Sequence, residues 1–193
     1  MTPRWLTAVV IFFAVTLCPV VSSAEEGYFV GAAYSYHVFQ GDIKNFPGSP
    51  GPGLFIGYHP DIPPHLRAGD EQYDLIFSYM TTRYHFSSGD AVSRRYGLDM
   101  RCRFLTSFKT QPYVLLGIGY HTLEDSFVNV GGAAFNVGAG IEQWMGPRFS
   151  IGAGAVYHKV EFNNVKVNSS QALEADGTKG DGYEWIMTGA YHF

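Results

Sequence analysis

Two short segments contain a histidine with a nearby carboxylate, as hydrolases use them, and the first also contains a serine: it comprises His85, Ser87 and Asp90. Residues two apart in an extended chain lie on the same face, so the His85 imidazole could take the proton of the Ser87 hydroxyl while Asp90 orients the ring. The chemistry would be nucleophilic attack on an acyl bond. Spacing alone is weak evidence, and we favour the simpler interpretation of a strand end followed by a polar loop.

The second segment contains His158, Lys159 and Glu161. A serine two positions after His158 would complete the same arrangement, but that position holds Val160. This segment therefore lacks a nucleophile. The other histidines are scattered and not paired with Cys or carboxylates at ligand spacing, so the sequence predicts no metal site and no cofactor.

A third set of reactive side chains alternates with apolar ones along one segment. Arg95, Asp99, Arg101 and Arg103 fall on one face, and Tyr96, Leu98, Met100, Cys102 and Phe104 fall on the other. A soluble sandwich cannot easily bury the apolar face beside so much charge. A barrel can, by turning the apolar face to lipid and the charged face to an enclosed lumen.

Glu142 and Glu184 supply further carboxylates at inward positions. Side chains just fill the interior of an eight-stranded barrel, so we expect these charges to form a network that seals and stiffens it. The inward glycines of later segments would leave room for the arginines to cross the lumen. A narrow polar pore and a ligand pocket are the alternatives.

Eight segments show the period-two alternation of half-buried strands. They predict an all-β fold, an eight-stranded antiparallel up-and-down transmembrane β-barrel. Phe29 and Phe55 break the alternation of their segments, and the register of the third segment is ambiguous because both faces hold apolar residues. The segments are 28–39, 53–59, 73–86, 95–104, 113–123, 133–144, 149–157 and 183–193.

The final segment has an apolar face with aromatic ends. Ten residues separate Tyr183 from Phe193, and at about 3.3 Å per residue with a tilt near 40° they cover roughly 25 Å, the apolar thickness of an outer membrane. Tyrosines and tryptophans near strand ends would lie at the level of the lipid headgroups. These are Tyr28, Tyr113, Trp144, Tyr157, Tyr183 and Trp185.

The connections divide into short and long ones. Those at 109–111 and 146–147 are short, whereas the polar stretch 163–182 is predicted to be a long outer loop. The Pro-rich stretch 60–72 is too long for this pattern, and it predicts either a small flap or plug or a misplaced strand. A ten-stranded barrel would require a break in a continuous segment, so eight strands remain the preferred number.

Residues 1–24 resemble a signal peptide, which would leave residues 25–193 as one barrel domain. A lipoprotein signal at Cys18 is disfavoured by Leu17, and Pro19 argues against a retained anchor. Cleavage would leave Cys102 as the only thiol, on the predicted lipid face. The net charge is −4 and no stretch is strongly basic, so no nucleic-acid partner is expected.

The glycine-rich segments PYVLLGIGY, AAFNVGAGIEQWMG and PRFSIGAGAVYH resemble the small outer-membrane β-barrel family related to the OmpA membrane domain and to OmpX. The resemblance implies an integral protein of a Gram-negative outer membrane, in contact with lipid and lipopolysaccharide. It also implies that the barrel-insertion machinery assembles the chain. The residues concerned in the last strand are Tyr183, Trp185, Tyr191 and Phe193.

The resemblance indicates location better than activity. Our first hypothesis is a structural or surface-interaction protein without catalysis, whose loop 163–182 has a possible extracellular partner. The lipid A deacylase family has a His-x-Ser-Asn motif near the end of its penultimate strand; His158 lies in a similar place, but Val160 replaces the serine. A lipid A hydrolase is therefore the second hypothesis, dependent on His85, Ser87 and Asp90, and a narrow pore is the third.

Overall fold

The computed structural model describes residues 27–41, 48–62, 69–86, 89–124, 128–167, 171–173 and 178–193. The predicted signal peptide, residues 1–24, lies outside these ranges, and so does Ser87. A helix long and apolar enough to cross a membrane is not found in the described ranges.

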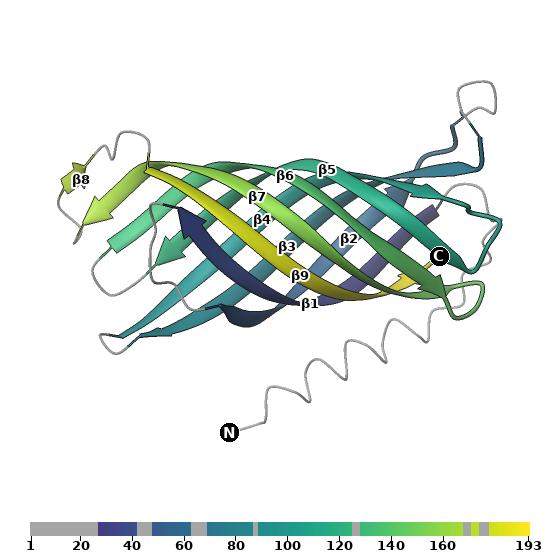
Figure 1. Ribbon diagram of the computed structural model, residues 1–193, viewed down its shortest axis with the longest axis horizontal. Coiled ribbons are helices and arrows are strands. Elements are labelled where there is room, and N and C mark those ends of the chain that lie inside the picture. The colour runs from purple at the N-terminus through teal and green to yellow at the C-terminus, as the bar shows by residue number, and fades with distance from the viewer. Residues whose placement is uncertain are drawn as a thin grey trace.

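Eight strands close into an antiparallel up-and-down barrel, as predicted (Figure 1). Each pairs with its neighbours in sequence, β6 pairs with β7, and β1 closes the ring against β9. The short β8 (Gln171–Leu173) pairs only with the outer part of β7. The barrel strands are β1 (Gly27–Gly41), β2 (Ser49–His59), β3 (Glu71–Phe86), β4 (Gly89–Phe104), β5 (Thr110–Glu124), β6 (Val128–Trp144), β7 (Phe149–Val167) and β9 (Thr178–His192).

The strands extend well beyond the apolar segments at one end, and the predicted loop 163–182 is wrong over much of its length. β7 continues to Val167 and β9 begins at Thr178. Backbone pairing with neighbouring strands supports these polar stretches, which the apolar alternation does not mark. For the same reason β2 begins at Ser49, before the start of the predicted segment 53–59. We call this end the loop end, and the opposite end, which carries Gly27 and Phe193, the terminus end.

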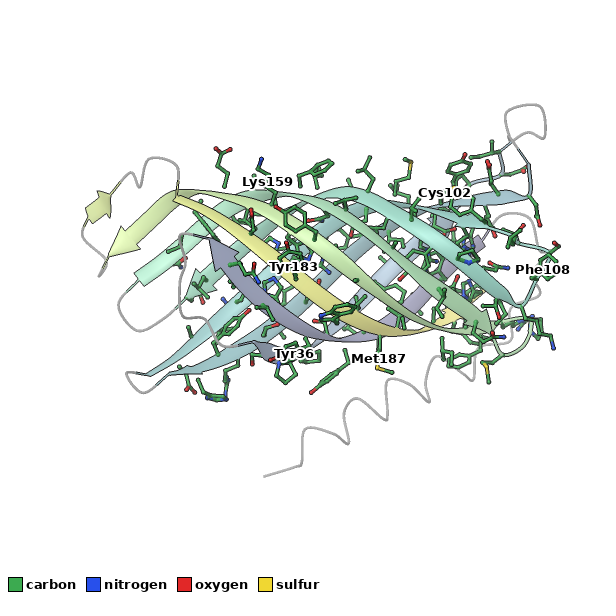
Figure 2. The ribbon with its side chains drawn as sticks, viewed as in Figure 1. Tyr36, Cys102, Phe108, Lys159, Tyr183 and Met187 are labelled. Carbon is green, nitrogen blue, oxygen red and sulfur yellow. The ribbon has the colours of Figure 1, made fainter. Side chains whose placement is uncertain are left out.

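The barrel wall is apolar on the outside. Figure 2 shows Tyr36, Tyr183 and Met187 on the outer surface, where the alternation placed them. The ambiguous register of β3 is resolved, because Leu75 and Phe77 are exposed on the wall whereas Ile76 and Met80 are buried in the lumen. The apolar side chains that are exposed on the outer wall match the predicted lipid-facing surface.

Reciprocal packing explains the two phenylalanines that break the alternation. Phe29 lies opposite Gly57 and Phe55 lies opposite Gly31 in the β1–β2 ladder. A Cβ atom on Gly57 would overlap the Phe29 ring, and one on Gly31 would overlap the Phe55 ring. Each glycine therefore makes room for an inward aromatic ring on the neighbouring strand.

The described part of the connection between β2 and β3 is fastened to the turn between β4 and β5. Asp70 accepts hydrogen bonds from the Thr106 hydroxyl and from the amide (3.0 Å) and hydroxyl (2.7 Å) of Ser107. The hydrogen bond from Thr106, followed by those from Ser107, lowers the pKa of Asp70 below its usual value. β3 then begins at Glu71, and the barrel strands number eight, as predicted. Residues 63–68 of this connection lie outside the described residues, so the predicted flap or plug stays a prediction.

We expect Gly57→Val to destabilise the barrel by about 1–3 kcal/mol, because the valine side chain would displace the Phe29 ring within a filled lumen. The measurement is the temperature at which the refolded barrel loses its heat-modifiable mobility on gels. Gly146→Val is the matched control, since no atom lies within 4 Å of the added Cβ there. Equal melting of the two variants would contradict the packing argument.

Candidate functional site

All six charged residues predicted to line the lumen are inward and buried: Arg95, Asp99, Arg101, Arg103, Glu142 and Glu184. They separate into two groups. The terminal cluster, near the terminus end, consists of Asp74, Arg101, Arg103 and Glu142. The central cluster, further along the same strands, consists of Arg95, Asp99, His158 and Glu184 with Asn136 between them.

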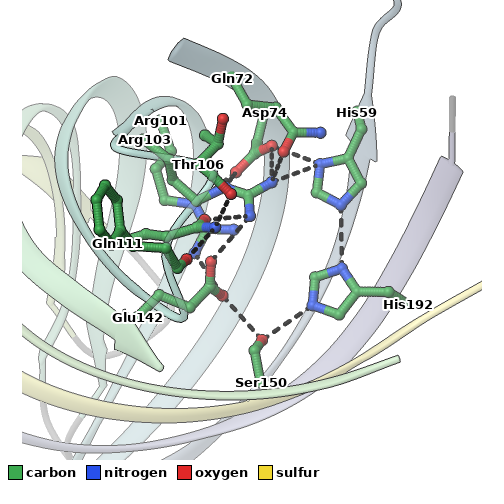
Figure 3. Close-up of polar contacts among 11 residues, drawn as sticks. His59, Gln72, Asp74, Arg101, Arg103, Thr106, Gln111, Glu142, Ser150 and His192 are labelled. Carbon is green, nitrogen blue, oxygen red and sulfur yellow. Dashed lines mark hydrogen bonds and ion pairs between the residues drawn. The ribbon is translucent and has the colours of Figure 1, made fainter. Parts of the chain in front are cut away.

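Asp74 is the centre of the terminal cluster (Figure 3). Its Oδ2 atom accepts hydrogen bonds from Arg101 Nε (2.7 Å) and Arg103 Nε (3.0 Å), and its Oδ1 atom accepts one from Arg103 Nη2 (3.0 Å). His59 Nδ1 lies 2.5 Å from the same Oδ1 atom. The carboxylate is thus surrounded by donors in a water-excluded site, where charge-assisted bonds are strong.

Glu142 provides the second negative charge. It lies 3.3 Å from Nη1 of Arg101 and 3.3 Å from Nη1 of Arg103. Arg103 has no exposed area and also donates to the side-chain oxygens of Gln111 (3.1 Å) and Gln72 (2.8 Å). Two arginines therefore face two carboxylates, which gives a neutral, densely hydrogen-bonded layer across the lumen.

A serine–histidine–histidine–aspartate chain adjoins this layer. Ser150 Oγ lies 2.9 Å from His192 Nε2, His192 Nδ1 lies 3.0 Å from His59 Nε2, and His59 contacts Asp74. The order is that of an activated nucleophile with an oriented base. However, Ser150 has no exposed area and also donates to Glu142 (2.9 Å), so an acyl group has no access to its hydroxyl in this conformation.

The central cluster is organised around Glu184. Its Oε2 atom lies 3.3 Å from Arg95 Nη2 and 3.0 Å from His158 Nε2. The other ring nitrogen of His158 contacts Asn136 (2.8 Å), whose amide donates to Asp99 (2.9 Å). His158 is thus held inside the barrel by contacts at both ring nitrogens. Val160, two residues later, is also buried, so no serine hydroxyl follows His158 at the position of the deacylase motif.

Apolar and aromatic side chains fill the space next to the terminal cluster. Phe29, Phe55, Ile76 and Ala190 pack together, and the Arg101 guanidinium lies 5.4 Å from the ring centres of Phe29 and Tyr113. Tyr113 contacts Gly140 and Gly154, so those inward glycines accommodate a tyrosine rather than an arginine. At the loop end an apolar cap is formed by Phe39, Tyr84, Ala91, Leu123, Ala134, Val160 and Phe162.

A small cavity lies between the central cluster and this cap. The space open to the centre of a water molecule is about 10 Å³, close to the minimum needed for one water. Its lining residues are His37, Met80, Thr82, Ser93, Arg95, His121 and Glu184. Within the described part of the chain, no group of three or more His, Cys, Asp or Glu side chains is arranged to hold a metal ion.

The residues of the predicted outer hydrolase site meet only in part. His85 Nδ1 lies 2.8 Å from Asp90 Oδ1, with 72% and 52% of the two side chains exposed. Ser87, the predicted nucleophile, lies outside the described residues. The histidine–acid contact is therefore present, whereas its relation to the serine remains a prediction.

Two aromatic residues predicted for the headgroup level lie inside instead. Tyr113 is buried beside Arg101, and Trp144 lies against His192, with ring centres 4.2 Å apart. Their inward positions follow from the alternation of β5 and β6, since both residues share the parity of the lumenal side chains. Residue type near a strand end was the misleading signal, and parity was the correct one.

Sequence reasoning also missed several arginine partners, Asp74, His59 and Gln111, and the residues His192 and Ser150 that adjoin them. All five lie at inward positions of their strands. The same alternation could have found them once the register of β3 was known. Which of these inward residues contact one another depends on the strand order and on the stagger between strands, and the sequence pattern gives neither.

The family model of the outer membrane protein beta-barrel domain matches residues 6–173. Curated proteins give no match. The structure is similar to that of Ail of Yersinia pestis, solved with the heparin analogue sucrose octasulfate, at 17% identity and a TM-score of 0.57, covering 88% of this chain and 99% of that one.

Two further structures have similar folds. Neisserial surface protein A matches at 15% identity and a TM-score of 0.56, covering 86% of this chain and 97% of that one. The outer membrane enzyme PagL matches at 12% identity and a TM-score of 0.53, covering 82% and 97%. At these identities the structures establish a shared fold only. The family match extends over most of the sequence, and the chain belongs to the outer-membrane β-barrel protein family.

Proposed function

We propose that this protein is a sealed barrel of a Gram-negative outer membrane, exported by residues 1–24, with a structural or surface-interaction role and no catalysis of its own. The observation that carries the proposal is the terminal cluster. Arg101, Arg103, Asp74 and Glu142 are buried and form four ion pairs across the lumen. A filled, neutral interior suits stiffness better than transport.

Several layers support a closed lumen. From the terminus end to the loop end they are the terminal cluster, the aromatic layer of Phe29 and Phe55, the central cluster and the apolar cap. An ion crossing the lumen would have to break the buried ion pairs and pass two apolar layers. Both steps carry a large desolvation penalty.

The outer wall and the loop end would carry the interactions. In the proposed membrane orientation the terminus end faces the periplasm. The insertion machinery would bind the last strand segment through Tyr183, Trp185, Tyr191 and Phe193. The wall would contact membrane lipid and lipopolysaccharide. The stretch 163–182 would meet an extracellular partner, and the likeness to Ail, solved with a heparin analogue, supports a surface-interaction role.

A lipid A hydrolase is the second candidate. The observation that favours it is the His85–Asp90 contact on the exposed wall at the loop end, beside Ser87 in the sequence. The fold shared with PagL, an outer membrane enzyme, is compatible with such a role. The buried Ser150 chain does not support it, because its hydroxyl is inaccessible.

We expect Arg103→Ala to lower the free energy of unfolding by about 3–5 kcal/mol, because the carboxylate of Asp74 would lose part of its neutralisation in a buried site. Arg94→Ala, which breaks a half-exposed pair with Glu124, should cost less than about 1 kcal/mol. Urea unfolding of the refolded barrel measures both. The wild-type barrel should give no single-channel steps in planar bilayers, and regular steps from the wild type would contradict the sealed lumen. Unchanged stability of Arg103→Ala would contradict the stiffening role of the terminal cluster.

We expect the refolded barrel to release no acyl chains from lipopolysaccharide, as followed by mass spectrometry. If release occurs, two serine variants identify its origin. Turnover that persists in Ser150→Ala and disappears in Ser87→Ala would replace the proposal by an outer-face hydrolase. Turnover lost only in Ser150→Ala would show that the buried chain opens to substrate.

A further inference from the structure

The central cluster holds more carboxylates than arginines. Its carboxylates are Asp99 and Glu184, its arginine is Arg95, and all three side chains are buried. Glu184 lies 3.3 Å from Arg95, whereas among the described residues no side-chain cation lies within 4.0 Å of Asp99. A buried carboxylate without a partner carries a large desolvation penalty and takes up a proton instead. The balance of charges therefore calls for one proton beyond the ionised carboxylates and neutral histidine.

The hydrogen bonds of the cluster call for the same proton. Three contacts run in a chain from Asp99 to Asn136 (2.9 Å), to His158 (2.8 Å) and to Glu184 (3.0 Å), and each needs one hydrogen. The Asn136 amide presents its NH2 group to one neighbour and its oxygen to the other, and a neutral imidazole has one N–H. With both carboxylates ionised, two hydrogens are available for three contacts. The third contact requires one additional proton.

Two arrangements supply this proton. With the Asn136 amide donating to Asp99, its oxygen accepts from Nδ1 of His158, so His158 donates from both ring nitrogens and is an imidazolium. With the amide turned over, a protonated Asp99 donates to Asn136, which donates to a neutral His158. Both arrangements satisfy all three contacts and leave the cluster neutral. The amide of Asn136 thus links two positions for one proton.

The other histidines near the cluster are poorer positions for the proton. Neither ring nitrogen of His121 has a hydrogen-bond partner among the described residues, so a charged ring there would lack acceptors. His37 contacts the Tyr84 hydroxyl (2.7 Å), but its Nε2 atom has no such partner. The titratable and charged groups that surround His158 are His37 of β1, Tyr84 of β3 next to His37, Arg95 and Asp99 of β4, His121 of β5 and Glu184 of β9.

We propose that the central cluster is a proton-binding site, in which Asp99, Asn136 and His158 hold one proton inside the folded barrel at neutral pH. The site does not depend on the surface role proposed above. Because the unfolded chain releases this proton, stability falls as the pH rises through the titration of the site. Below about pH 6.5 the histidine of the unfolded chain is protonated too, and the dependence disappears. The alkaline barrel has one unbalanced charge beside the small cavity.

Asp99→Asn removes the need for the proton, because the new amide supplies the third hydrogen and one carboxylate is gone. Urea unfolding of the refolded barrel is followed between about pH 6 and pH 10. We expect the folding equilibrium constant of the wild type to fall, relative to that of Asp99→Asn, by up to about tenfold per pH unit above the titration of the site. Asp90→Asn, which changes an exposed carboxylate, should keep the wild-type dependence. Parallel pH curves for the wild type and Asp99→Asn overturn the proposal.

Nuclear magnetic resonance of the wild-type barrel in micelles detects the proton without a change in the site, so the proposal remains testable if Asp99→Asn does not refold. At neutral pH the nitrogen shifts of His158 distinguish the imidazolium from the neutral ring, and the carboxyl carbon shift of Asp99 distinguishes the acid from the carboxylate. His158→Gln identifies the histidine signals. One proton on either group supports the site. A neutral His158 together with an ionised Asp99 shows that the cluster binds no extra proton.

Discussion

The neutralisation of Arg101 and Arg103 by Asp74 and Glu142 is the interaction on which the rest of the barrel depends. Two guanidinium groups within a closed sheet that faces hydrocarbon can persist only if each finds carboxylates and amide oxygens inside. The apolar outer wall is the counterpart of this arrangement. Side chains alternate between the two faces of a strand, so the residues on either side of Arg101 and Arg103 point outward, and these residues are apolar.

The alternation of residue types predicted the eight strands and the inward face of β4, because one face had to meet lipid and the other an enclosed interior. It also placed Glu142 and Glu184 inside. It did not pair Asp74 with the arginines, because the register of β3 was ambiguous. Ile76 and Met80 on one face are as apolar as Leu75 and Phe77 on the other, so the inward face could not be identified. Pairing depends on stagger between strands, which only the ladder provides.

Residue type misled where it was read apart from parity. Tyr113 and Trp144 resemble headgroup aromatics by position, but they fill the lumen beside Arg101 and His192. The polar stretch 163–182 resembles a loop by composition, but β7 and β9 extend through part of it. Strand parity decided the first case, and backbone pairing with neighbouring strands decided the second. Both outweighed the local preference of the residue type.

The seam between β1 and β9 has a consequence for how the barrel forms. His192, on the last strand, contacts His59 and Ser150, and Phe29 on the first strand stacks on both histidines. These contacts join the two ends of the sequence, so they appear only when the final edges meet. Until that moment His59 and Ser150 lack their contacts with His192, so the side of the lumen next to the arginine layer is left uncovered at the seam. Contacts between strands so far apart in sequence are the kind that form slowly.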